Sequence, residues 1–175
     1  MPEGTGPAIT RRELGVGAAA LAVGAVAASA TDSAVGAATP APDRATISFT
    51  EAHAVLAAGE AKARAVGVPM YMLIVDESGI EKASARMDGN GLASLTLVPA
   101  KAKTAIAFRT PSDVLADRLA GNAARIASFT ASGFSLVGGG VPITRKGVVI
   151  GAIGVGGGTP EQDVEVAKAA VAAVA

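Results

Sequence analysis

The sequence contains no cysteine and only one histidine among its 175 residues. The absence of cysteine excludes disulfides, thiolate nucleophiles, iron–sulfur clusters and cysteine-ligated zinc. A single histidine, His53, excludes a histidine-rich metal site within one subunit, and a Ser-His-Asp triad would have to use that residue. Without disulfides, the protein must be stabilised by its own core or by oligomerisation.

Aromatic side chains and net charge are equally scarce. Tryptophan is absent, aromatic residues make up 3% of the chain, and 15 basic residues balance 15 acidic ones. We therefore expect a core of alanine, valine, leucine and isoleucine, with glycines where elements approach closely. A neutral chain without basic runs flanked by aromatic residues gives no reason to expect a nucleic-acid partner.

The first residues have the features of an export signal. The pair Arg11-Arg12 precedes an apolar run from Val16 to about Ala30, an arrangement typical of a twin-arginine signal peptide. Ala28-Ser29-Ala30 fits a cleavage site, and Gly36-Ala37-Ala38 is a second candidate. The alternative is a retained membrane anchor, for which the run is short.

These features predict an exported protein, located outside the cell or in its envelope. The predicted parts are a signal peptide with the start of a tether over residues 1–38, a flexible linker over 39–46 and one domain over 47–175.

The first half of this domain predicts a helix, a hairpin and further helices. Ser48 and Glu51 have capping-box spacing and predict a helix that ends at Gly67. Apolar residues recur along it at helical intervals: Phe49, Ala52, Leu56, Ala63 and Val66. Residues 69–75 and 80–87 predict two strands around a turn. A helix over about 93–108, interrupted or restarted at Pro99, and a short helix capped by Thr110 with Pro111 at its first position follow.

The second half predicts another hairpin and a final helix. Residues 123–137 are ambiguous and predict an irregular segment with one short strand. Residues 141–144 and 148–155 predict paired strands. Thr159 and Gln162 predict a second capping box, and the helix behind it should bury Val164, Ala167, Val171 and Val174. Two hairpins separated by helices indicate an α+β domain with a single antiparallel sheet flanked by helices.

Several short segments together carry a family resemblance that covers the chain from about Ile47 onward. The chain resembles the GlcG/HbpS family of haem-binding or haem-degrading domains in Ile74-Val75-Asp76, Arg86-Met87-Asp88-Gly89, residues 100–105, residues 138–143, residues 151–155 and Gln162-Asp163. Two positions depart from the family pattern. Gly156 stands where the family often has serine, and Pro99 falls in a helix that usually has no proline.

The resemblance implies a profilin-like α+β fold and a homo-oligomer, typically an octamer. Exported members with twin-arginine leaders bind haem and iron, and some serve a membrane sensor kinase. Other members accompany glycolate or diol metabolism. The leader predicted above places this chain with the exported, HbpS-like branch.

His53 is the first candidate for a haem-iron ligand, because imidazole is the commonest protein ligand of haem iron. The alternative is a half-exposed helix histidine that binds nothing. Tyr71 could ligate ferric haem as phenolate, although core packing in an interior strand explains it better. A corner of the chain is formed by Arg86, Met87 and Asp88. Their polar groups could lie together at the mouth of a pocket, and the alternative is a salt-bridged turn.

Two further groups of charged residues could meet a ligand. Lys101, Lys103 and Arg109 could pair with haem propionates or lie on a solvated helix face. Asp76, Glu77 and Glu81 could bind an iron ion through oxygen or form a solvated acidic turn. The glycines at 156–158 could hold an anion, but a tight strand-to-helix connection explains them better.

These residues favour a binding protein over an enzyme, because the usual nucleophiles and bases are missing. The first interpretation is an exported haem- or iron-binding oligomer that sequesters haem or reports it to a membrane partner. The second is an enzyme, or a protein that accompanies one, acting on a small carboxylated metabolite with Arg86, Asp88 and Lys101 around its pocket. The third is an oligomeric scaffold without a ligand.

Overall fold

The computed structural model describes residues 45–174, so the predicted signal peptide and most of the predicted linker lie outside the described residues. One four-stranded antiparallel sheet has the order β2-β1-β4-β3. The α+β prediction with a single antiparallel sheet is confirmed. The elements in chain order are α1 (Phe49–Val66), β1 (Tyr71–Asp76), β2 (Glu81–Arg86), α2 (Ser94–Phe108), α3 (Ser112–Leu119), α4 (Ala123–Ala131), β3 (Gly140–Arg145), β4 (Val148–Gly156) and α5 (Pro160–Val171).

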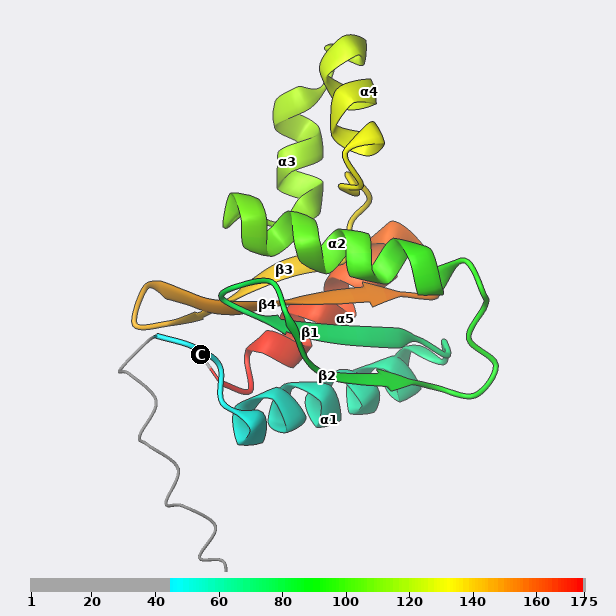
Figure 1. Ribbon diagram of the computed structural model, residues 1–175. Helices are drawn as coiled ribbons and strands as arrows, with labels where there is room; N and C mark the ends of the chain where they lie inside the picture. Colours follow the sequence, from blue (N-terminus) through cyan, green and yellow to red (C-terminus); the bar gives the residue numbers. More distant parts are fainter. Residues whose placement is uncertain (1–44, 175) are drawn as a thin grey trace, which may run out of the picture. The chain divides into compact units, whose positions relative to one another are not determined.

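The sheet carries a separate apolar core on each face. Helices α1 and α5 pack against one face, and α2 packs against the other (Figure 1). Side chains alternate along β1, so that Met72 and Ile74 join the first core while Leu73 and Val75 join the second. Apolar side chains on both faces are typical of a strand in the interior of a sheet, which is where β1 lies, between β2 and β4.

The predicted capping box of α1 is confirmed. Ser48 Oγ accepts a 3.2 Å hydrogen bond from the N–H of Glu51, and a Glu51 carboxylate oxygen accepts one of 2.8 Å from the N–H of Ser48. Phe49 belongs to the apolar series seen in the sequence, but 66% of this residue is exposed. Ile47 takes the core position instead: it is fully buried, and its N–H donates to Ile150 O.

Helix α2 runs through Pro99 without the predicted interruption. It packs on β4 so closely that a Cβ on Gly154 would overlap the carbonyl oxygen of Val98 and lie 2.9 Å from the N–H nitrogen of Ala102. This contact holds the helix against the sheet on both sides of the proline. Tertiary packing therefore outweighs the roughly 3 kcal/mol that an interior proline costs a helix.

Residues 123–131 form helix α4, so the prediction of an irregular segment with a short strand is wrong. Asn122 caps the helix by accepting from the N–H of Arg125. A capping residue is a local signal for a helix, but the apolar pattern behind it is weak and left the segment ambiguous in the sequence. No residue of α4 is buried. Its apolar contact is made by Phe129, which stacks on Phe108 at 5.0 Å.

Two further predictions, the N-cap of α3 and the buried face of α5, are wrong in detail. Pro111 is itself the N-cap of α3, and Thr110 donates its hydroxyl to Phe108 O instead of capping the helix. Helix α5 has its predicted capping box, but Val164, Val171 and Val174 are only half-buried. The helix is rotated toward the face of Asp163, and its buried residues are Asp163, Val166, Ala167 and Ala170.

Of the helices within residues 45–174, none is long and apolar enough to cross a membrane.

Candidate functional site

The single histidine lies on an exposed stripe of α1. Phe49, His53, Ala57, Glu60 and Arg64 recur along one side of the helix, because 3.6 residues make one turn. All are exposed except Glu60, which is half-buried. The His53 and Phe49 rings lie 4.2 Å apart, tilted by 57°. The stripe therefore offers an accessible imidazole beside an exposed aromatic ring.

The far end of this stripe meets the Arg86–Asp88 corner. Glu60 and Arg64 of α1 line a cavity of about 330 Å³ together with Arg86, Met87 and Asp88. Arg64 pairs with Glu60 at 3.4 Å, and Arg86 is exposed. Met87 is half-buried, and its sulfur accepts a 3.4 Å hydrogen bond from the N–H of Met70. The corner predicted from sequence thus lines a cavity on the helix that carries His53.

The two lysines predicted to meet propionates point in different directions. Lys103 is exposed, donates to Ser132 O at 3.1 Å and lies 4.6 Å from the centroid of the Phe134 ring. Lys101 is only 2% exposed and forms a 2.7 Å ion pair with Asp163. Lys101 also lines a different cavity from Arg86 and Asp88, so the enzyme arrangement predicted from sequence is not assembled in one pocket.

The cavity beside Lys101 has a volume of about 240 Å³. It lies where β4 ends and α5 begins, and its lining includes Ser94, Asp163 and the glycines at 156–158. The N–H of Gly158 donates to Asp163 at 3.0 Å. The glycine turn therefore connects strand to helix tightly and also forms one wall of a pocket.

Tyr71 begins strand β1, and the acidic turn follows the other end of the same strand. Burial raises the pKa of the half-buried Tyr71 phenol, and the charge of Glu81 raises it further. A raised pKa disfavours the phenolate that haem iron would need. Asp76 accepts from the N–H groups of Ser78 and Ile80, so it organises the turn. Within residues 45–174, no three His, Asp or Glu residues are grouped as a metal site.

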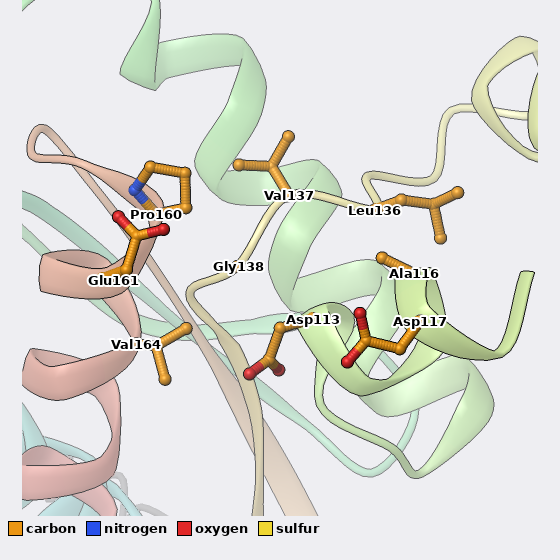
Figure 2. Close-up of a pocket in the computed structure, with 9 residues that line it drawn as sticks. All are labelled: Asp113, Ala116, Asp117, Leu136, Val137, Gly138, Pro160, Glu161 and Val164. Carbon is orange, nitrogen blue, oxygen red and sulfur yellow. The ribbon is translucent and has the colours of Figure 1, made fainter. Parts of the chain in front are cut away.

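A third cavity, of about 470 Å³, has an acidic rim (Figure 2). Asp113 and Asp117 of α3 face Glu161 of α5 across an apolar floor that includes Val137 and Val164. Hydrogen bonds, first from its own backbone N–H, lower the pKa of Glu161. Three carboxylates would repel haem propionates, and the cavity contains no histidine, tyrosine or methionine.

Comparison with known proteins identifies the domain. The family described as "Haem degrading protein HbpS-like" matches residues 47–172. The chain belongs to the HbpS-like family. This confirms the family resemblance seen in the sequence.

Sequence relatives come from two bacteria. The HbpS-like domain is 35% identical over 130 residues to the corrinoid adenosyltransferase PduO of Salmonella typhimurium, covering 73% of this chain and 39% of PduO. It therefore spans well under half of that relative. It is also 35% identical to an uncharacterized 15.0 kDa protein of Citrobacter freundii, covering 73% of this chain and 91% of that protein.

Two solved structures share the fold. The PduOC:heme complex superposes with a TM-score of 0.69 at 35% identity, covering 74% of this chain and 95% of that one. A variant of HbpS from Streptomyces reticuli gives a TM-score of 0.68 at 28% identity, covering 79% and 99%.

Three residues at these sites escaped the sequence reasoning. Arg64 follows His53 by eleven residues, which returns to the same side of a helix, so helical spacing could have found it. Ser94 precedes Lys101 by seven residues on α2, about two turns, so helical spacing could have found it as well. Asp163 carried no local signal, because it meets Lys101 only through the packing of α2 and α5 around the HbpS-like sheet.

Proposed function

We propose that this domain binds haem along the exposed stripe of α1, with His53 as an axial ligand. The observation that carries the proposal is the accessible His53 imidazole beside the exposed Phe49 ring, in a chain whose relative PduOC was solved in complex with haem. Histidine is a common haem ligand, and bound haem would supply an iron centre for binding small ligands or exchanging electrons.

The other residues of the stripe suit the apolar ring of haem and the propionates at its edge. Phe49 offers an exposed aromatic face, and Ala57 keeps the helix surface low enough for a flat ring to approach. Arg64 and Arg86 lie at the far end and supply guanidinium groups, which pair well with carboxylates such as propionates. Met87 lines the same cavity with its sulfur, which already accepts a hydrogen bond.

A haem on this stripe would leave one face of the ring uncovered by the same chain. We propose that a second copy of the chain covers this face in a homo-oligomer. The family resemblance implies such an assembly, typically an octamer. The exposed apolar side chains of Leu92, Leu95 and Leu97, between 42% and 78% exposed, offer further surface for such contacts. Light scattering on the purified chain should then show an assembly, and a monomer at roughly tens of micromolar would contradict it.

Export and signalling complete the proposed role. The Arg11-Arg12 pair supports export by the twin-arginine route, and an exported haem-binding oligomer could sequester haem or report it to a membrane sensor kinase. An iron ion bound by oxygen ligands is a weaker alternative, because the acidic turn uses Asp76 for its own hydrogen bonds.

A haemin titration followed by absorbance tests the main proposal. The Soret band of haemin should shift as the protein is added and saturate at a fixed stoichiometry. A band that moves no further than with an unrelated protein of similar size would overturn the proposal.

A further inference from the structure

A buried lysine lines the small cavity between α2 and α5. Lys101 Nζ donates to Val155 O at 2.9 Å and to Asp163 Oδ2 at 2.7 Å. An ammonium group carries three N–H donors. These two acceptors use two of them, and Lys101 lines the 240 Å³ cavity, so one donor is left for a group inside it.

The surrounding glycines make room for this side chain. A Cβ on Gly139 would come within 3.1 Å of Lys101 Nζ, and one on Gly140 would overlap the lysine's carbonyl oxygen. A buried ion pair contributes little stability compared with apolar residues of the same volume. An ammonium group held at a cavity wall in this way is placed to donate to a group inside the cavity.

A second donor borders the same space. Ser94 Oγ accepts from Asn90 Nδ2 at 3.3 Å, so its own hydroxyl proton must point elsewhere. The position that a Cβ on Gly156 would take is 3.7 Å from Ser94 Oγ and 3.8 Å from Lys101 Nζ. The hydroxyl and the ammonium thus converge on the side of the cavity beside Gly156.

We propose that this cavity binds a small monocarboxylate, with Lys101 and Ser94 donating to its oxygens. A carboxylate accepts hydrogen bonds at both oxygens, and the bond from a charged ammonium is the stronger one. Asp163 already balances the lysine charge, so the site offers an anion hydrogen-bond donors without spare positive charge, which disfavours a ligand with two negative charges. The volume lies below the usual 300–1,000 Å³ of pockets for drug-sized ligands, which selects a small acid.

This site is independent of the proposed haem stripe. It lies between α2 and α5, whereas His53 lies on the exposed side of α1. Its apolar rim includes Leu97, Val137 and Pro160, which would contact the carbon part of the acid. Either proposal can fail without the other.

The test titrates the haem-free full chain with acetate, glycolate and pyruvate, and with acetamide as the neutral counterpart of acetate, followed by calorimetry or NMR. At least one acid should bind saturably, and acetamide should bind at least about tenfold more weakly than acetate where acetate binds. No saturable binding of any acid would overturn the proposal.

Two variants locate the binding. Ser94→Ala should weaken it about tenfold or more while keeping the fold, because Asn90 Nδ2 still has Pro69 O and Gly156 O as acceptors. The double variant Lys101→Met with Asp163→Leu replaces the charges by apolar groups and should abolish it. Lys168→Met, on the exposed side of α5, is the control and should bind normally. Unchanged binding in the first two variants would place the acid elsewhere and overturn the proposal.

Discussion

Lys101 of α2 and Asp163 of α5 stand 62 residues apart in the sequence and meet at 2.7 Å, both almost completely buried. Their pair joins the helix on one face of the sheet to the helix on the other. Strand β3 begins and strand β4 ends at this edge of the sheet. Both residues of the pair line the small cavity that lies there.

Breaking this pair on one side should destabilise the fold strongly. Lys101→Met leaves the Asp163 carboxylate buried without its partner, and we expect a loss of about 3–5 kcal/mol in the free energy of unfolding. The double variant Lys101→Met with Asp163→Leu should recover most of that loss. Urea denaturation measures both, with Lys168→Met as the control. Losses that simply add in the double variant would contradict a coupled pair.

The capping box of α1 should make stability depend on pH. The backbone N–H of Ser48, followed by its hydroxyl, lowers the pKa of Glu51 below its ordinary 4.5, and Arg145 adds to this. A lowered folded-state pKa means that the stabilisation is present above about 4.5 and is lost as pH falls through the lower folded value.

Glu51→Gln should therefore flatten the acid limb of the melting-temperature profile below about pH 4.5. At neutral pH the loss should stay below about 1 kcal/mol, because the ion pair of Glu51 with Arg145 is partly exposed to solvent. Thermal melts from pH 3 to 7 measure this, with Glu165→Gln as the control for removing a surface carboxylate. An acid limb identical to that of the unmutated protein would rule out this role for Glu51.

Gly154→Ala should be among the costly single-methyl changes in the domain. The new Cβ would overlap Val98 O and lie 2.9 Å from the Ala102 nitrogen, both backbone atoms that cannot rotate away. We expect a loss of about 1–3 kcal/mol or more by overpacking. Gly91→Ala, whose Cβ would meet nothing within 4 Å, is the matched control. Equal melting temperatures for the two variants would argue against the close packing of α2 on β4.

The haem proposal gives two residues different roles: His53 binds the iron, and Arg64 pairs with the propionates. His53→Ala should change the position or shape of the Soret band more than it changes the affinity, because apolar ring contacts remain. Arg64→Ala should do the reverse, weakening affinity while the band stays in place. Lys103→Ala tests the propionate role predicted from sequence, and Arg118→Ala on α3 is the exposed-arginine control. An unchanged spectrum for His53→Ala would remove it as the ligand.

Export depends on residues outside the described part of the chain. Replacing Arg11 and Arg12 by lysine keeps the charge but removes the paired guanidinium groups on which a twin-arginine signal depends. The precursor should then stay inside the cell, as fractionation and immunoblotting would show. Normal export of the double variant would exclude the twin-arginine route.

Local features of the fold could be predicted from the sequence alone. The capping boxes at Ser48 and Thr159 need only residues three apart, and the two hairpins need only alternation with a turn between. These interactions are short in sequence, so residue type and spacing decide them. The same holds for the exclusion of cysteine chemistry, and the family resemblance followed from short segments in order.

Only the tertiary structure decided which side of each helix is buried. Whether Lys101 lies in solvent or in the core depends on Gly139, Gly140 and Asp163, residues far from it in sequence. Likewise, Arg64 reaches the Arg86 corner only because α1 packs across the sheet next to β2. A side chain's burial is set by the elements that close over it, and those elements are chosen by the packing of the whole chain rather than by neighbours in sequence.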